Sequence, residues 1–475
     1  MSRFRILLGL VLPLAACAAP TGSTEDGAIA SESAELSAVA KLRVVHASPD
    51  APAVDIYVNG GATPVATALA FTETTGFLRL RPGSYTVDVR ANPSTAADPV
   101  VFSAALTLAG GSRTTAVATG SLASIDPAAA FRILPLDESF AAPGAGNASV
   151  RIVHTSPDAP SVSVDVGDDD SANPEIANID RFADTGAAGV ALPAGAPLQI
   201  GIGAGGVRQT AFTTPALPDG AGLLVIATGF LSHLPRERDG FGLLAVGPSG
   251  TVGFVRQNPL VYALHASPDA PAVRLGLPDG PTVVGRLSFG ELSAPLQVPP
   301  NAYDLDVFAA DGGGPAVARV PTGQLIAGER YLAVAGGFLD AAAGGAPFAL
   351  SVYKDAFTRG ETELQAIHAS PDAPAVDVTA TGDDGATVSL AQNASFAQAA
   401  GIASLALPGE TFFTIGVAPA GVAAPVASFS ILASPAERSF VLVTGALDPA
   451  RGASLRLLGV DTSSSPWHAS IVLPD

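Results

Sequence analysis

The sequence predicts an all-β protein: four tandem antiparallel β-sandwich domains, immunoglobulin- or transthyretin-like, on an N-terminal tether. Three observations support this fold class. A motif recurs four times, apolar residues alternate with polar ones, and glycine and proline are scattered between the apolar runs. Alternation with a period of two is typical of strands that have one buried and one solvated face. Frequent Gly and Pro indicate that the strands are short and joined by turns.

Length and composition limit the possible classes of protein. At 475 residues the chain is too long for a single hydrophobic core. Hydrophobic residues make up 48% and charged residues 14% of the chain, which is typical of folded domains. The formal net charge is −19, so a nucleic-acid backbone would be repelled and we expect no nucleic-acid partner.

The N-terminus has the pattern of a bacterial export signal. Two arginines precede a short apolar run over residues 6–14, too short to span a bilayer as a helix. The sequence Leu-Ala-Ala-Cys that ends at Cys17 resembles the lipobox of bacterial lipoproteins. The resemblance implies cleavage behind Ala16 and acylation of Cys17, and several acyl chains on one residue hold a folded domain at a membrane durably.

This N-terminus predicts a signal peptide at 1–16 and a flexible tether at 17–41. The expected location is that of an exported, membrane-anchored lipoprotein at the outer membrane or the cell surface. Outer-membrane sorting is implied by resemblance to enterobacterial lipoproteins, because Ala18 follows the cysteine. The alternative is an ordinary signal peptide whose cysteine happens to lie at the cleavage site. Cys17 is the single cysteine, so we expect no internal disulfide.

Four landmarks repeat in constant order: a histidine motif, a phenylalanine, a turn followed by a strand, and an apolar strand that ends in glycine. They recur about every 105 residues, a period that fits a whole domain rather than a propeller blade. We expect independent beads on a string with short linkers after residues 138, 247 and 355. The histidines are His46, His154, His265 and His368, the phenylalanines Phe71, Phe182, Phe289 and Phe396, and the glycines Gly120, Gly229, Gly337 and Gly445. The predicted domains are 42–138, 149–247, 260–355 and 363–462, followed by a C-terminal tail at 463–475.

The repeated motif predicts a rigid structural corner. Pro49 and Pro52 fix the backbone and remove two donors, so a strand ladder cannot run through the motif. Ser48 and Asp50 offer acceptors that close turns on backbone N–H groups, and His46 lies at the strand end, half-buried against the corner. The remaining motif residues are His154, Ser156, Pro157, Asp158, Pro160, His265, Ser267, Pro268, Asp269, Pro271, His368, Ser370, Pro371, Asp372 and Pro374.

Catalytic and metal-binding interpretations of the motif are weaker. His, Ser and Asp within one strand-turn do not form the nucleophile, base and orienting acid of a triad, so we expect no enzyme. His46 and Asp50 are too few ligands for zinc, and we expect no metal and no cofactor. Two acidic runs, 168–170 and 383–384, could be calcium loops but are more typical of solvated turns.

The HASPDAPAVD element is similar to the signature of a bacterial family called domain of unknown function 4397. The resemblance covers four units and implies secreted or cell-surface proteins with β-rich repeats, without an established activity. Three hypotheses for the function remain open. They are a non-enzymatic surface module that binds a protein or glycan, favoured because repeated weak sites gain by avidity, a structural spacer without a dedicated ligand, and an envelope hydrolase.

Overall fold

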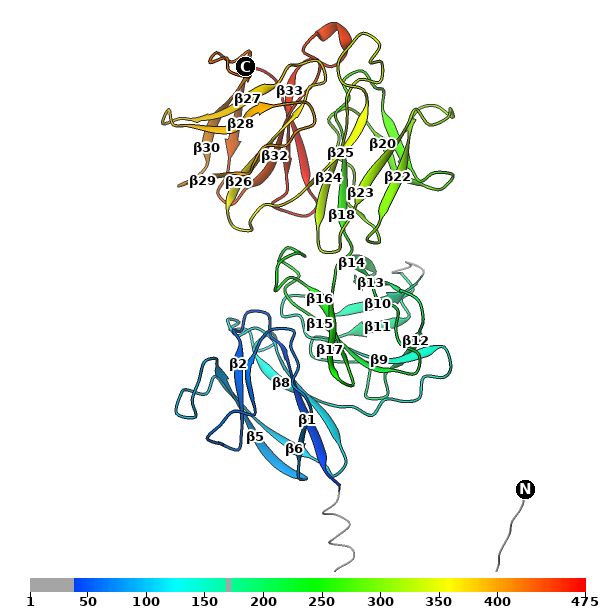
Figure 1. Cartoon of the computed structure of the whole chain (residues 1–475), viewed down its shortest axis with the longest axis vertical. Coiled ribbons are helices and arrows are strands. Elements are labelled where there is room, and N and C mark those ends of the chain that lie inside the picture. The colour runs from blue at the N-terminus through cyan, green and yellow to red at the C-terminus, as the bar shows by residue number, and fades with distance from the viewer. Residues whose placement is uncertain (1–37, 168–171) are drawn as a thin grey trace, which may run out of the picture.

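The computed structural model describes residues 38–167 and 172–475, and the described chain is built from strands apart from one short 3-10 helix, η1 (Pro449–Arg451). The strands form eight sheets, two in each of four domains (Figure 1). The predicted all-β class with tandem sandwich domains is therefore confirmed. The domains span residues 40–137, 147–256, 260–354 and 362–472, and are called domains 1 to 4 below.

The first two domains share one order of strands. Domain 1 contains β1 (Ala40–Ala47), β2 (Val54–Val58), β3 (Ala66–Leu69), β4 (Leu78–Leu80), β5 (Gly83–Ala91), β6 (Phe102–Leu108), β7 (Arg113–Thr119) and β8 (Arg132–Asp137). Domain 2 contains β9 (Asn147–His154), β10 (Val162–Val166), β11 (Ile176–Ile179), β12 (Val190–Pro193), β13 (Gln199–Ala204), β14 (Val207–Thr213), β15 (Gly222–Thr228), β16 (Gly242–Gly247) and β17 (Gly250–Arg256).

The last two domains repeat that order. Domain 3 contains β18 (Leu260–His265), β19 (Val273–Gly276), β20 (Thr282–Leu287), β21 (Leu296–Gln297), β22 (Ala302–Ala309), β23 (Ala318–Gln324), β24 (Arg330–Gly336) and β25 (Ala349–Lys354). Domain 4 contains β26 (Thr362–Ala369), β27 (Val376–Gly382), β28 (Thr387–Ala394), β29 (Ala403–Leu405), β30 (Thr411–Pro419), β31 (Ala427–Ala433), β32 (Arg438–Thr444), β33 (Arg456–Asp461) and β34 (His468–Val472).

Each domain has a motif sheet, which contains the strand that leads into the repeated motif, and an outer sheet. In domain 1 the motif sheet has the order β4-β1-β7-β8 and the outer sheet the order β3-β2-β5-β6. Neighbouring strands are antiparallel except for one pair in every motif sheet: β1 with β7, β9 with β15, β18 with β24 and β26 with β32 are parallel. Patterning with a period of two does not distinguish the two directions, so this parallel pair was not predicted.

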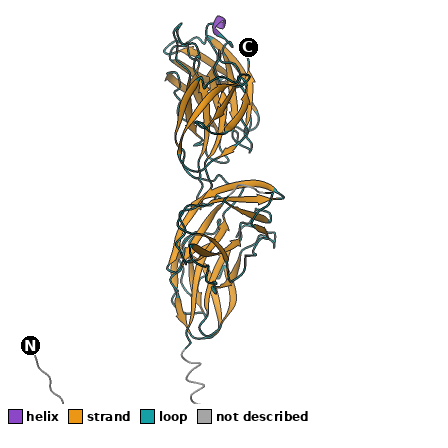
Figure 2. Ribbon diagram, turned by 90° about the vertical axis from the view of Figure 1, so that its right-hand side faces the viewer, coloured by secondary structure: helices purple, strands orange, loops and turns teal. Residues whose placement is uncertain are grey.

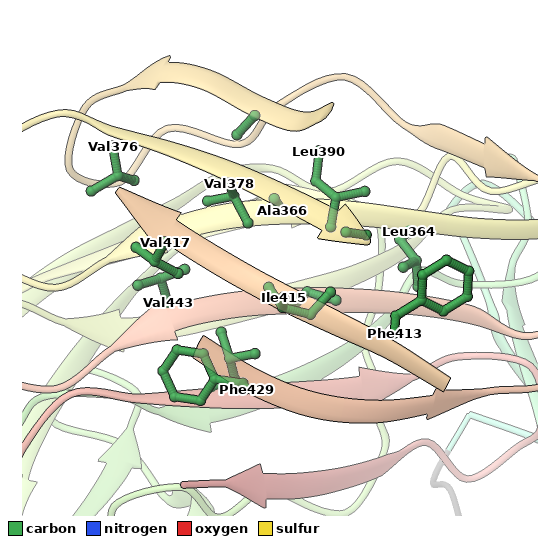
Figure 3. Packing of buried hydrophobic residues seen from close by; sticks show 14 of the residues in the cluster. Leu364, Ala366, Val376, Val378, Leu390, Phe413, Ile415, Val417, Phe429 and Val443 are labelled. Carbon is green, nitrogen blue, oxygen red and sulfur yellow. The ribbon is translucent and has the colours of Figure 1, made fainter. Parts of the chain in front are cut away.

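The core of each domain lies between its two sheets. In domain 4, Phe413, Ile415 and Val417 point inward from β30, where they meet Leu364 of the motif sheet (Figure 3). The residues between them along β30 are more exposed. The outer sheet thus keeps the predicted alternation, with one face in the core and one in solvent.

The motif sheets are buried on both faces because the domains pack in pairs. Val45 and Val117 of domain 1 share a buried apolar cluster with Ile226 and Leu244 of domain 2. The motif sheets of domains 3 and 4 form the equivalent cluster. The prediction of independent beads is therefore wrong: domains 1 and 2 form a first pair and domains 3 and 4 a second pair, stacked along the long axis (Figure 2).

Two segments placed outside the domains by the sequence belong to motif sheets. The predicted linker after residue 247 contains β17, and the predicted tail at 463–475 contains β34. Each is a fifth strand at the end of the motif sheet of the second domain in its pair. The tail also carries Trp467, which is 4% exposed and packs in the interface of the second pair.

Candidate functional site

The four motif histidines make one set of hydrogen bonds at the end of their strands. His46 is fully buried, and its Nε2 lies 3.0 Å from the carbonyl oxygen of Pro52. The backbone N–H of Ser48 donates to Nδ1 at 3.3 Å. Because Nδ1 accepts, Nε2 carries the proton and donates it to the proline carbonyl. The equivalent Nε2 contacts are His154 with Pro160, His265 with Pro271 and His368 with Pro374.

Domain 2 departs from this pattern at one atom. The Nδ1 atom of His154 is buried and has no hydrogen-bond partner within the described residues. The other three domains have Ala after the motif histidine, whereas domain 2 has Thr155. Its hydroxyl donates to the carbonyl of Ala227 at 3.2 Å, a bond that alanine cannot make.

The motif serine and aspartate fasten the corner to the segment, beginning with a glycine, that follows the neighbouring parallel strand. Ser48 Oγ donates to the carbonyl of Gly120 at 2.7 Å. Asp50 accepts from the N–H groups of Leu122 at 2.8 Å and Ala123 at 2.9 Å. The same serine-to-glycine bond joins Ser156 to Gly229, Ser267 to Gly337 and Ser370 to Gly445. The aspartates Asp158, Asp269 and Asp372 accept two backbone N–H groups in the same way.

The glycines at this contact have a steric reason. Gly120 has φ +84°, and a Cβ there would lie 2.4 Å from the carbonyl oxygen of Ala130. The three equivalent glycines combine a positive φ with a similar collision. Only glycine fits where the backbone is left-handed and another chain segment approaches so closely.

Electrostatics keep the motif histidines neutral. Burial lowers the pKa of His46, His154, His265 and His368, and the hydrogen bond that each Nε2 donates to a proline carbonyl offsets this only in part. Burial also opposes ionisation of Asp50 and Asp158. Their hydrogen bonds outweigh it, so the pKa of both carboxyls lies below the usual value.

The motif does not assemble a nucleophile and a base. Ser48 Oγ points its proton at the Gly120 carbonyl instead of the ring of His46, which is itself committed to the backbone. A Ser-His arrangement requires the hydroxyl to donate to the imidazole. The motif side chains therefore act on their own backbone.

One of the predicted phenylalanine landmarks is displaced. Phe71, Phe289 and Phe396 contact the motif histidine edge-on, at centroid distances of 6.3, 6.2 and 6.4 Å. In domain 2 the backbone N–H of Phe182 donates to the carbonyl of His154. In domain 1 the residue that makes the equivalent bond, to the carbonyl of His46, is Thr72. Phe182 is thus one position out of register, and its ring stacks instead under Arg132 of domain 1 at 3.9 Å.

A polar cavity lies where the two pairs meet. It has a volume of about 540 Å³ and is lined by residues of domains 2, 3 and 4, among them Gln257, Gln297, Arg330, Arg438 and Ser464. Among the described residues that line it there is no carboxylate, although the chain has a net charge of −19. Sequence reasoning missed this site because its residues come from three different domains.

His233 at the rim of this cavity belongs to a second cluster that the sequence analysis missed. Its Nδ1 lies 3.1 Å from Asp239 and 3.6 Å from Glu237, and single ligand atoms of the three residues lie within 4.8 Å of one another. The spacing H-x3-E-x-D was the available signal. Arg359 already donates to Glu237 at 2.9 Å and contacts His233 Nδ1 at 3.2 Å, so it occupies the position that a cation would need.

Two groups of predicted residues lie elsewhere. Cys17 and the acidic run 168–170 are outside the described residues. The run 383–384 lies in an exposed turn, where Asp384 accepts from the N–H of Ala386 at 2.8 Å. No helix in the described part of the chain is long and apolar enough to cross a bilayer.

The fold and the repeated corner define a class of protein: tandem β-sandwich repeats in which one histidine motif locks each domain. The chain belongs to the family described as Domain of unknown function (DUF4397), whose model matches residues 40–165 and 259–379, more than half of the sequence. The suspected family is thereby confirmed. Each match begins at the first domain of a pair and extends into the second.

Comparisons beyond the family are distant. No curated protein matches the chain. Among solved structures, the chain is similar to the Bacillus anthracis TIE protein at 11% identity and a TM-score of 0.15, over 83% of this chain. It spans 65% of the length of that protein chain.

Proposed function

We propose that the chain is an exported, non-enzymatic lipoprotein, anchored in the cell envelope through Cys17, that displays paired β-sandwich domains as a binding module. The ligand is a protein or a glycan, nucleic acid is not a partner, and no resident cofactor or metal is needed. The single observation that carries the proposal is that the repeated histidine, serine and aspartate all bond to their own backbone. These bonds support a structural role for the repeated motif.

The anchor is tested by metabolic palmitate labelling of whole cells that make the wild-type chain or Cys17→Ser. The proposal expects label in the wild-type chain, loss of label in Cys17→Ser, and release of that variant from the membrane fraction. Protease added to intact cells then reports whether the domains face outward. Equal labelling of both chains, or membrane retention of Cys17→Ser, would contradict the anchor.

Binding is tested with the soluble Cys17→Ser chain on a glycan array and on extracellular-matrix proteins. A binding module gives a saturable signal that excess unlabelled chain displaces. The matched control is the same chain with Asp50→Asn, which weakens one corner without altering the cavity between the pairs. No saturable signal on either surface would count against a binding role.

A structural spacer is the second candidate, and the packing of the domains favours it. Two domains locked face to face through a buried apolar cluster resist bending better than separate beads. A spacer should support its role on cells when the cavity residues are changed, whereas a binder should lose its ligand.

A further inference from the structure

In three of the four domains, the motif-sheet strand that is paired in parallel begins with an arginine. Arg113 begins β7, Arg330 begins β24 and Arg438 begins β32. In each case the arginine carbonyl accepts a backbone N–H from one residue beyond the paired strand, at 2.8 Å. These partner residues are Glu138, Asp355 and Thr462. The three arginines and their three partners are therefore equivalent positions in the fold.

The partner position differs in chemistry. Glu138 Oε2 lies 3.6 Å from Arg113, and Asp355 accepts from Arg330 Nε at 2.8 Å. Domain 4 has Thr462 instead, which is fully buried and donates its hydroxyl to the carbonyl of Arg438 at 3.1 Å. Threonine carries no charge, so Arg438 lacks the carboxylate that the other two arginines have.

Arg438 is consequently a buried cation with open donors. The residue is 5% exposed, and its Nη2 donates to the carbonyl of Ser463 at 2.9 Å. Nε and Nη1 are buried and find no hydrogen-bond partner in the described part of the chain. A buried guanidinium left in this state is costly. Burial and then the nearby Arg330 lower the pKa of Arg438, an effect that Asp355 offsets in part.

The open arginine lies on the wall of the cavity between the pairs. The cavity also has Arg330 and Arg359 on its wall, with amides from Gln257 and Gln297. Its volume of about 540 Å³ is within the range of small-molecule sites. Within the described residues, its lining holds positive charge and hydrogen-bonding groups but no acidic side chain.

We propose that this cavity binds a small carboxylate ligand, and that the ligand carboxylate supplies to Arg438, from the cavity side, the negative charge that Asp355 supplies to Arg330. Planar guanidinium and carboxylate groups match in a two-bond geometry, and the serine hydroxyls of 463–465 offer partners for the remainder of the ligand. The inference concerns ligand chemistry and does not depend on where the protein is anchored.

The direct test is calorimetric titration of the purified full chain with acetate, citrate and D-glucuronate, with D-glucose as the uncharged match to glucuronate. At least one carboxylate should bind and raise Tm, and glucose should not. Arg438→Gln should weaken that binding by at least about tenfold, the size expected for losing a charge-assisted bond. Arg286→Gln, an exposed arginine in domain 3, is the control and should bind as wild type does.

The sharper test supplies the missing carboxylate from the chain. Thr462→Asp should raise Tm without ligand and abolish the response to carboxylates, because the new carboxylate then pairs with Arg438. Absence of binding by all three carboxylates, or unchanged binding by Arg438→Gln or by Thr462→Asp, would overturn the proposal. Tighter binding of inorganic phosphate than of any carboxylate would overturn the assignment of the ligand class.

Discussion

The two domain pairs fill the same interface with different chemistry. Arg43 in β1 and Tyr262 in β18 hold the same place relative to the motif histidine, and both are buried between paired domains. Arg43 donates to the carbonyl of Gly247 in domain 2 at 2.6 Å and lies 2.5 Å from Glu138. Tyr262 instead stacks on Trp467 of domain 4, with ring centroids 4.4 Å apart.

The two interfaces differ in their side-chain contacts at this position, yet both hold two motif sheets face to face. The packing of the sheets, and not one particular contact, therefore defines a pair. A charged interface is stable only while every buried charge keeps its partner, whereas a stacked aromatic interface depends on area and shape. The second pair should therefore be most sensitive to loss of volume. The first pair should be most sensitive to loss of one charge.

Trp467→Ala should have the largest effect. It removes the stack on Tyr262 and the contact with Phe440, and should lower the free energy of unfolding of the second pair by about 3–5 kcal/mol. Urea unfolding followed by far-UV circular dichroism measures the loss. His468→Ala, an exposed neighbour, is the control. A loss below about 1 kcal/mol would mean that the aromatic interface contributes little.

Arg43→Met should have the second largest effect, a loss of about 2–4 kcal/mol, because it leaves the buried carboxylate of Glu138 with the more distant Arg113 as its remaining cationic partner. Adding Glu138→Gln should recover most of the loss. Trp467 is the single tryptophan and lies in the second pair, so its fluorescence transition should not move while the circular dichroism transition does. A shift in both would mean that the two pairs unfold together.

His46→Gln should cost about 1–2 kcal/mol at pH 7.5, since the amide replaces the buried ring imperfectly. The folded-state pKa of His46 is lowered, so the unfolded chain binds the proton more readily. The stability contributed by the neutral ring is complete above about pH 6.5 and is lost as pH falls below it. Urea unfolding at several pH values should show a flatter acid limb for the variant. His468→Gln, a substitution at an exposed histidine, is the control.

Thr444→Val and Thr228→Val should have the smallest effect, about 1 kcal/mol each. Their hydroxyls donate across the interfaces to the carbonyls of Ala266 at 3.1 Å and Ala47 at 2.7 Å. This is a bond that both pairs share, so equal losses in urea unfolding would support the common geometry. A large loss in one pair only would show that the pairs differ in backbone packing too.

The sequence predicted the parts of the fold that depend on local pattern. Alternation predicted the outer strands, and the prolines of the motif lie where β1 has ended. The prediction from sequence failed where the burial of a strand depends on another domain. Segments such as 116–119 and 441–444 are continuously apolar or small, which is the pattern of strands covered on both faces. Because these strands were treated as members of separate beads, the pairing was missed.

The candidate site was harder to predict from the sequence, for a related reason. Matching residues by identity placed Phe182 with Phe71, whereas backbone pairing places it with Thr72. The equivalence of Glu138, Asp355 and Thr462 is likewise hidden by their different side chains and becomes clear only in the strand register. A cavity built from three domains leaves no local signature in the sequence.

The buried face between motif sheets limits how the chain can grow or shrink. A copy gained or lost alone would leave one apolar sheet without cover, and such a face tends to associate with a second molecule. Viable relatives should therefore carry their repeats in even numbers, with the fifth strand on every second copy. The unit that is duplicated or lost should be the pair of domains.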